Sequence, residues 1–275
     1  MIDILNVEVQ RRGKPYDKFN AMSRIVDRLK CGIDNKVYIK DINLNIHYGY
    51  LPQNRNKTAY SKNIYNIKRK MGVPRFLVSP RGIRNYDYNL LNEFQRKVFA
   101  YSVVKSIQLV LRKTNKSLKN STILVDDSLD PKAYNILEEL SKQCRHIVLL
   151  SKDIKKTSKV QQKIIANFGI SPEITYEEEY AVKISDFVIS TRDKVYGYCD
   201  NIWYINNIYE PYEIRDTFIN DISFKSQWSN LLEDISPELI GAILCQMSEK
   251  DIETSLRYNG LFIDKIKFNE RLIVL

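Results

Sequence analysis

The sequence predicts an α/β protein with a Rossmann-like, mostly parallel sheet and flanking helices, together with a basic N-terminal α+β part. Between residues 121 and 207, short apolar runs rich in branched residues alternate with helical patterns, as in parallel sheets with crossover helices. Charge also divides the chain. Residues 1–120 carry 25 Lys/Arg and 8 Asp/Glu, whereas residues 121–275 carry 18 and 25. We therefore predict a basic domain over 1–115 and an α/β domain over 120–275.

The first strand of the α/β part is expected to be buried. Ile123–Val125 is a short apolar run of the kind found in buried strands. The polar run Asp-Asp-Ser at 126–128 follows its carboxyl end. A helix is expected next, because Asp130 can act as N-cap and Pro131 is tolerated at the first helical position.

Further elements follow with the spacing of a parallel sheet. Apolar runs predict strands at 147–150, 187–189 and 202–205, and a weaker one at 173–176. A helical pattern covers 155–168, and the glycine after it is the expected left-handed cap. Strands separated by helices of this length imply parallel pairing.

The loops after these strands are the expected ligand cleft. Open parallel sheets bind ligands beyond the carboxyl ends of their strands, where the strand order changes direction. This rule selects the loops that begin at residues 126, 151 and 190. The residues expected to line a cleft there are Ser128, Ser151, Lys152, Ser190, Thr191 and Arg192.

Elements of both classes are expected in the N-terminal part. Alternating patterns predict strands at 1–10 and 37–46, and helical patterns cover 59–71 and the long segment 88–113. An amphipathic helix is expected over 19–31, with one apolar face formed by Met22, Ile25, Val26 and Leu29. After the parallel sheet, two C-terminal helices and a terminal hairpin are expected.

A strongly basic stretch lies between residues 48 and 85, which include no acidic residue. Lysine and arginine neutralise phosphates, and the interleaved Tyr50, Tyr60 and Tyr65 could stack on unpaired bases. A basic patch could equally dock on an acidic protein surface or on another copy of this chain. No motif of a particular nucleic-acid module supports the first reading. The candidate binding residues are Arg55, Lys57, Lys62, Lys68, Arg69, Lys70, Arg75, Arg81 and Arg84.

Clustered carboxylates suggest a metal site as an alternative. Asp126 and Asp127 follow one strand and Asp193 follows a later one, so the three could share an Mg²⁺ or Mn²⁺ ion. The segments ILVDDS and DFVISTRD resemble the acidic strand ends of PIN-type nucleases. That resemblance implies metal-dependent cleavage of nucleic acid. A local reading also exists, because aspartates after strands often cap the next helix.

A nucleotide site is the third alternative. The run KISDFVIS is similar to the nucleotide-binding halves of dehydrogenases, which implies a bound dinucleotide. The first turn, however, reads DDSLDP where a GxGxxG pattern would let the backbone approach a pyrophosphate. Two carboxylates there would repel phosphate. Paired aspartates also suggest a response-regulator-like receiver, but the next strand ends in Ser-Lys-Asp, with the wrong spacing for a phospho-acceptor.

The remaining composition points to a cytoplasmic protein. The four cysteines form no CxxC pair, which favours reduced thiols, and two histidines offer little for a zinc site. No apolar run is long enough for a membrane helix, so no membrane partner is expected.

The leading sequence-based hypothesis is a non-enzymatic, cytoplasmic binding or regulatory protein. Its basic surface would engage a polyanion such as nucleic acid, or an acidic protein, and the Rossmann-like part would be a scaffold. The alternatives are a metal-dependent nuclease or phosphotransfer enzyme, and a nucleotide-binding Rossmann-like enzyme. No cofactor is favoured, apart from Mg²⁺ or Mn²⁺ for the nuclease. Association of copies is also considered.

Overall fold

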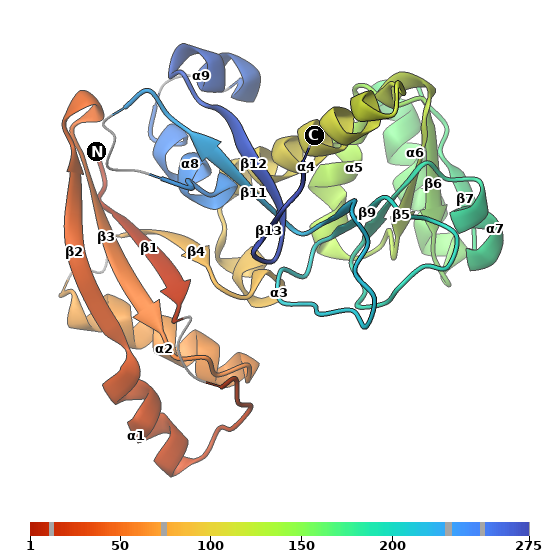
Figure 1. Ribbon diagram of the computed structural model, residues 1–275. Coiled ribbons are helices and arrows are strands. Elements are labelled where there is room, and N and C mark those ends of the chain that lie inside the picture. Colours follow the sequence, from red (N-terminus) through yellow and green to blue (C-terminus); the bar gives the residue numbers. More distant parts are fainter. Residues whose placement is uncertain (11–13, 73–75, 229–232, 248–250, 275) are drawn as a thin grey trace. The chain divides into compact units, whose positions relative to one another are not determined.

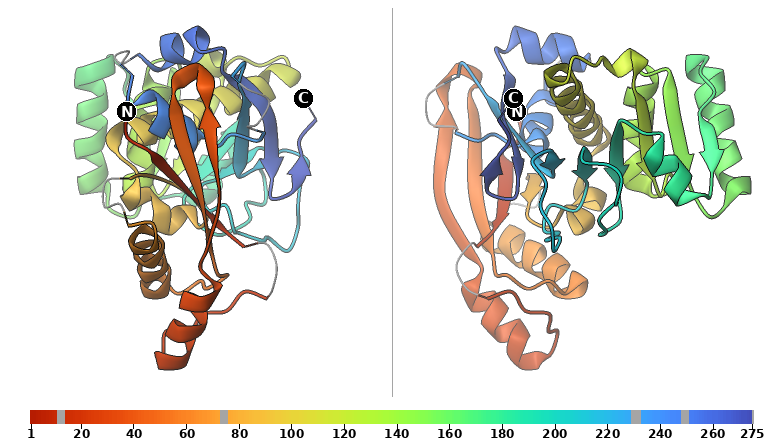
Figure 2. Two further views of the ribbon diagram at one scale, coloured as in Figure 1. Left: turned by 90° about the vertical axis from the view of Figure 1, so that its left-hand side faces the viewer. Right: turned by 45° about the vertical axis from the view of Figure 1, so that its right-hand side comes forward.

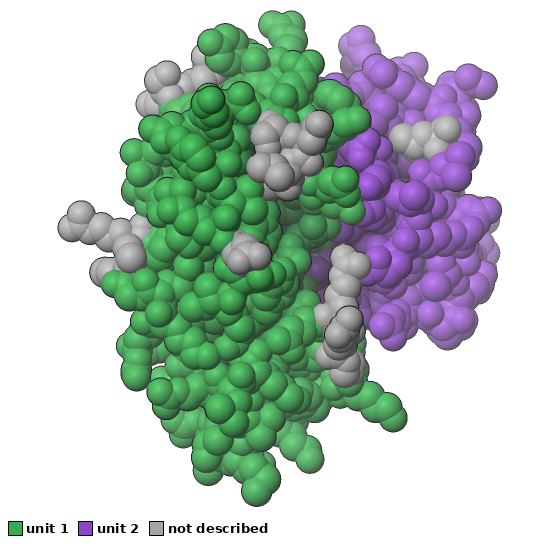
Figure 3. All heavy atoms as spheres, turned by 60° about the vertical axis from the view of Figure 1, so that its left-hand side comes forward, with its two compact units in different colours: residues 1–98, 224–262 green, residues 99–223, 263–275 purple. Residues whose placement is uncertain are grey.

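The computed structural model describes residues 1–10, 14–72, 76–228, 233–247 and 251–274 (Figure 1). The chain forms two compact units, each of which contains two separate segments (Figure 3). Unit 1 comprises residues 1–98 and 224–262, and unit 2 comprises residues 99–223 and 263–275.

Unit 2 is built on six parallel strands in the spatial order β10-β9-β8-β5-β6-β7. When the six strands are numbered along the chain from β5 and read across the sheet from β7 to β10, the order is 3-2-1-4-5-6, which is the Rossmann arrangement. The predicted Rossmann-like fold is therefore confirmed. The strands are β5 (Thr122–Asp126), β6 (His146–Leu150), β7 (Glu173–Thr175), β8 (Phe187–Ser190), β9 (Ile202–Tyr204) and β10 (Phe218–Ile219).

Capping residues mark where the helices of unit 2 begin and end. In α5 (Pro131–Ser141), the Asp130 carboxylate accepts a hydrogen bond from the Lys132 backbone N–H at 2.8 Å. Helix α6 (Ile154–Phe168) ends at Gly169, whose φ of +71° is a left-handed conformation that suits glycine. A shorter helix, α7 (Glu178–Lys183), connects β7 to β8. No helix connects β8 to β9 or β9 to β10, where described loops run instead.

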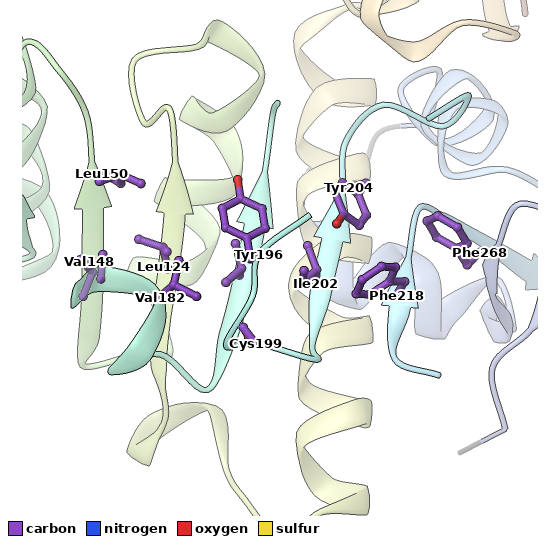
Figure 4. Packing of buried hydrophobic residues seen from close by; sticks show 12 residues of the cluster. Leu124, Val148, Leu150, Val182, Tyr196, Cys199, Ile202, Tyr204, Phe218 and Phe268 are labelled. Atoms are coloured by element: carbon purple, nitrogen blue, oxygen red, sulfur yellow. The ribbon is translucent and has the colours of Figure 1, made fainter. Parts of the chain in front are cut away.

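One face of the parallel sheet carries an apolar and aromatic core (Figure 4). The rings of Tyr204, Phe218 and Phe268 lie against one another, with centroids 5.3 to 6.0 Å apart. Such tilted and edge-on pairs are favourable beyond the area they bury. The ring of Phe268 comes from β12 (Phe262–Phe268), so the C-terminal segment covers the face where crossover helices are missing.

The opposite face holds Trp203, which is fully buried. Its neighbours in β9 belong to the cluster of Figure 4, and alternate strand residues point to opposite faces. The ring of Trp203 packs edge-on against Phe99 of α4 (Glu93–Lys113), with centroids 5.6 Å apart. The indole N–H donates to the Ser106 hydroxyl at 3.1 Å, so an apolar contact and a polar contact together fix α4 on this face.

Replacing Ser106 by alanine should lower the free energy of unfolding by about 1–3 kcal/mol, because the buried indole N–H loses its acceptor. The measurement is chemical denaturation followed by tryptophan fluorescence. Ser141→Ala is the control, since this buried hydroxyl donates to Leu137 of its own helix and its loss orphans no donor. Equal losses in the two variants would contradict the assigned role of Ser106.

Unit 1 contains a mixed four-stranded sheet in the order β2-β3-β1-β4. β1 is parallel to both β3 and β4, whereas β2 is antiparallel to β3. Both views of Figure 2 show β2 and β3 side by side. The strands are β1 (Ile4–Val9), β2 (Gly32–Ile39), β3 (Leu44–Leu51) and β4 (Leu77–Arg81).

The single strand expected over 37–46 is wrong. β2 ends at Ile39, a short 3₁₀ turn covers Lys40–Ile42, and Asn43 takes a left-handed conformation with φ +49° before β3 begins. The apolar alternation is real on both sides of this turn, but it belongs to two antiparallel strands. A chain reversal therefore lies inside the range that was expected to form one strand.

Helices complete unit 1. They are α1 (Ala21–Lys30), α2 (Lys57–Lys70), α3 (Arg84–Asp87), α8 (Pro237–Leu244) and α9 (Ile252–Tyr258). α2 lies close to β3, since a Cβ atom on Gly49 would stand 2.9 Å from Ile67 Cγ2. α8 joins this unit through Gln95, whose side-chain amide donates to the Val78 and Glu238 carbonyl oxygens, both at 3.0 Å. The chain thus returns to unit 1 after the parallel sheet, a division that the charge pattern does not indicate.

A small three-stranded sheet in the order β11-β12-β13 includes β11 (Asp221–Lys225) and β13 (Arg271–Leu272). The β12–β13 pair is antiparallel, as expected for the terminal hairpin. Within the described residues, no helix has the length and apolar character needed to span a membrane.

Candidate ligand pocket at the switch point of the parallel sheet

A pocket of about 360 Å³ opens at the carboxyl ends of the parallel strands. It lies where the strand order changes direction, since β5 has β6 on one side and β8 on the other. The loops selected from the sequence supply most of its wall. The lining residues are Asp126, Asp127, Leu129, Leu150, Ser151, Lys152, Asp153, Tyr176, Glu178 and Arg192.

Asp126 is the centre of the polar contacts beside this pocket. It is the last residue of β5 and is fully buried. Arg192 donates from Nε to Asp126 Oδ2 at 2.7 Å and from its terminal amino group to Oδ1, a bidentate ion pair. The Tyr196 hydroxyl also donates to Oδ2. The Asp126 carboxylate therefore accepts three hydrogen bonds, two of them from a cation, and a buried charge requires such partners.

The loop after β8 holds these donors in place. The Ser190 hydroxyl donates to the Arg192 carbonyl oxygen at 2.8 Å and lies 2.8 Å from the Tyr196 hydroxyl. The Thr191 hydroxyl donates to the Asp126 carbonyl oxygen at 3.3 Å. The interaction with Asp126 raises the pKa of Arg192, and burial, followed by the Asp126 charge, raises the pKa of Tyr196. Arginine thus stays charged and tyrosine stays neutral.

The six predicted cleft residues divide into two groups. Ser151, Lys152 and Arg192 line the pocket. Ser128, Ser190 and Thr191 are buried at the same strand ends without being part of its wall. For all six residues a role in ligand binding stays a prediction, although Ser190 and Thr191 shape the loop that carries Arg192.

The first turn after β5 is acidic and has no glycine. Asp127 takes a left-handed conformation with φ +53°, which is uncommon for a residue with a side chain. Partial burial, together with the charges of Asp130 and Asp126, raises the pKa of Asp127. Because the Asp130 side chain caps α5, no free backbone cradle for a phosphate is evident at this helix start.

Glu178, at the start of α7, extends the charged contacts along the pocket wall. One of its carboxylate oxygens lies 3.4 Å from the Arg192 guanidinium, and the other pairs with Lys194. The Lys194 ammonium in turn lies 4.8 Å from the centre of the Tyr196 ring. Arg192 is therefore held between a buried and a partly exposed carboxylate. The pocket wall has four carboxylates and two cationic groups, a net charge of −2.

Two of the three aspartates proposed as metal ligands have other side-chain partners. Asp126 is bound to Arg192 and Tyr196, and both carboxylate oxygens of Asp193 accept from the Asn206 amide, at 2.9 and 2.8 Å. Within the parts of the chain that the structure describes, no three His, Cys, Asp or Glu side chains gather closely enough to hold a metal ion. The metal hypothesis stays a prediction without a formed ligand set.

Sequence reasoning missed Tyr196, Glu178 and Tyr176. The first lies in a loop whose pattern indicates no element, and the second lies in a run of three glutamates that gives no reason to prefer one of them. The sequence did contain a usable signal for the ion pair between Asp126 and Arg192. A buried aspartate at the end of one strand needs a cation, and Arg192 follows the neighbouring strand, β8, by two residues.

The nine basic residues selected from the sequence all belong to unit 1 but differ in their surroundings. Arg84 is buried against Glu238, with 3.2 Å between Nε and Oε1, so it is a structural charge and not a surface contact. Arg81 donates to the Asp234 carbonyl oxygen at 2.8 Å. Lys70 donates to the Cys31 carbonyl oxygen at 2.8 Å. Arg75 lies outside the described residues.

The other five also lie at the surface, as Lys70 does. Lys62 and Arg69 line a groove between α1 and α2, and the Lys62 ammonium lies 5.1 Å from the centre of the Tyr65 ring. Arg55 and Lys57 are exposed, and Lys68 is partly exposed. Some cations of the basic stretch are thus exposed, whereas others bond to groups of the protein itself. The sequence alone does not distinguish these two kinds.

No protein-family model matches the chain, and no curated protein matches it. Among solved structures, L-tryptophan dehydrogenase from Nostoc punctiforme is similar over 93% of this chain and 78% of its own, with 10% identity and a TM-score of 0.39. A chorismate mutase/shikimate 5-dehydrogenase fusion protein from Clostridium acetobutylicum matches over 74% and 77%, with 13% identity and a TM-score of 0.36. Ligand-free 5-ketofructose reductase of Gluconobacter sp. strain CHM43 matches over 74% and 79%, with 10% identity and a TM-score of 0.35. Likenesses at this level do not bear on activity.

Proposed function

We propose that unit 2 binds a nucleoside-type ligand, neutral or weakly charged, in the pocket at the switch point of its sheet. The observation that carries the proposal is the position and lining of this pocket. It lies where open parallel sheets place their ligands, and its volume is within the usual range for small-molecule sites. The scaffold alone would not specify a ligand, whereas the chemical groups in the pocket wall do restrict the ligand class.

Those groups suit the two halves of a nucleoside. Carboxylates accept hydrogen bonds from ribose hydroxyls, and Asp127 lies in the wall at the first turn. Tyr176 is 69% exposed and offers an aromatic face to a base, while Leu129 and Leu150 add apolar surface. An inert scaffold, as the leading sequence-based hypothesis assumed, does not account for this combination.

Phosphate groups fit poorly in the same pocket. Its net charge of −2 and the glycine-free, acidic first turn oppose a pyrophosphate, and Arg192 is already paired with Asp126 and Glu178. The proposal therefore differs from a conventional dinucleotide site. It assigns no catalytic step, and the metal-dependent alternative has no observation that favours it.

Titration of the full-length protein with adenosine, AMP and ADP tests the proposal by calorimetry. Affinity should fall in that order, by about fivefold for each added negative charge, which corresponds to about 1 kcal/mol. Asp127→Asn should reduce the difference in affinity between adenosine and AMP, because it removes one carboxylate from the pocket wall.

The matched control is Asp216→Asn, which removes an exposed carboxylate of the same unit outside the pocket wall. It should leave the order and the spacing of the affinities unchanged. Tighter binding of ADP than of adenosine would contradict the proposed ligand class. No heat of binding for any nucleoside at millimolar concentration would remove the proposal altogether.

A further inference from the structure

Helix α1 of unit 1 has its apolar side chains on the outside. The predicted amphipathic helix forms, but Met22, Ile25 and Leu29 are 76%, 64% and 80% exposed, and Val26 is also exposed. These four residues, which we call the α1 stripe, follow the spacing of one helix face. A stripe of this kind normally faces a core, so its exposure requires an explanation.

The inward face of α1 is polar instead. Ser23 and Asp27, one turn apart, are its buried residues. The Asp27 carboxylate accepts hydrogen bonds from the Tyr16 hydroxyl and from the Asn54 and Asn63 amides, the latter two at 2.8 and 3.1 Å. The orientation of α1 is therefore fixed by a satisfied network, because turning the stripe inward would carry Asp27 outward and leave the buried Asn63 amide without its acceptor.

A groove of about 430 Å³ lies beside the stripe, between α1 and α2. Phe19 and Ile25 give it an apolar part, and Arg24, Arg28, Lys62 and Arg69 give it four cationic groups. Asp27 is the one acidic residue in its wall, and its oxygens already have the donors named above. Among the described residues, none of the four cations has an acidic side chain within ion-pair distance.

We infer that the α1 stripe and this groove dock an acidic, amphipathic peptide segment of a partner protein. Its apolar side chains would cover the stripe, and its carboxylates would meet the four cationic groups in the groove. Charge complementarity identifies the occupant as anionic. The exposed aliphatic stripe distinguishes it from a nucleic acid, whose phosphates leave such side chains without a partner. The concave groove suits a helix or strand better than a flat lipid surface.

The test uses fluorescence anisotropy with two labelled synthetic 18-residue peptides of leucine, alanine and glutamate. In one, the leucines recur at positions i, i+3, i+4 and i+7, which places them on one helix face. The other has the same composition in scrambled order. The full-length protein should bind the first at least about tenfold more tightly than the second, since only the first buries leucines on the stripe. Binding should weaken with added salt.

The decisive variant is Arg28→Ser/Leu29→Ser, which removes one cation and one exposed apolar side chain from α1. It should weaken binding of the first peptide about tenfold or more. The control is Arg257→Ser/Tyr258→Ser on α9, an exposed cationic and apolar pair in the same unit, which should change binding less than about twofold. Because both pairs are exposed, neither change should unfold the protein.

Three results would overturn the inference. The first is the absence of binding to the amphipathic peptide, or equal binding to both peptides. The second is tighter binding to single-stranded RNA or to phosphatidylserine vesicles that is lost in Arg28→Ser/Leu29→Ser, which would identify another class of partner. The third is a dimer in sedimentation that the same variant dissociates, which would make a second copy the occupant. Nucleoside binding by unit 2 is independent of all three.

Discussion

Replacing Arg192 by methionine should lower the free energy of unfolding by about 3–5 kcal/mol, because it leaves the fully buried Asp126 carboxylate without its bidentate cation. The Tyr196 hydroxyl would remain as a donor but carries no charge to balance the carboxylate. Methionine keeps much of the volume of the arginine stem, so lost packing contributes little. The measurement is urea denaturation followed by far-ultraviolet circular dichroism.

Two variants separate the ion pair from general effects. Arg215→Met removes an arginine that pairs with Asp200 and Glu213, both well exposed, so it should cost at most about 1 kcal/mol. Asp126→Leu/Arg192→Met removes both partners and should recover part of the loss, because no buried charge is left alone. If Arg192→Met destabilises no more than Arg215→Met, the carboxylate has found other solvation and the assigned role is wrong.

This ion pair shows what the sequence could predict about the pocket and what it could not. Apolar runs and the polar residues that end them predict the strand that ends at Asp126 and the loop that contains Arg192. Both positions were expected at the cleft. Their pairing joins residues 66 positions apart. It depends on β5 and β8 being neighbours in the sheet, which local periodicity does not encode.

Helix α1 illustrates a different limit. The periodicity of its apolar residues predicts a helix with one apolar face, and the helix is present. The direction of that face depends on Tyr16, Asn54 and Asn63, which supply the donors that hold Asp27 inward. A helical pattern defines a face, whereas tertiary partners decide which side is buried. For a similar reason, counting charges along the sequence wrongly assigns Arg84 to the basic surface. Its acidic partner, Glu238, comes from a distant segment, and the two form a buried ion pair.

The pH dependence of stability should be dominated by Asp87, at the end of α3 in unit 1. This carboxyl group is buried, and desolvation raises its pKa to about 7, although the Tyr60 hydroxyl and the Gly82 N–H donate to it at 2.6 and 3.0 Å. Glu238 raises the pKa further, and Arg84 opposes that effect. Because the folded pKa lies above the unfolded value of 3.8, the folded state holds the proton more tightly.

The sign of the effect follows from this difference. Between about pH 4 and pH 7 the folded protein binds more protons than the unfolded chain, so stability falls as pH rises, by at most about 1.4 kcal/mol per pH unit and about 4 kcal/mol in total. Above pH 7 both states are ionised at this position, and the contribution levels off. The stabilisation is fully present below the unfolded pKa.

The Asp87→Asn variant tests this assignment, because asparagine is isosteric and cannot ionise. It should be less stable than the wild type at pH 5, since Tyr60 and Gly82 donate to different oxygens of Asp87 and the amide nitrogen that replaces one of these oxygens cannot accept. By pH 8 that difference should shrink or reverse, because only the wild type then holds a buried charge. Denaturation midpoints at pH 5, 6, 7 and 8 would measure it, with Asp216→Asn as the exposed control. Parallel curves for wild type and Asp87→Asn would show that another group carries the pH dependence.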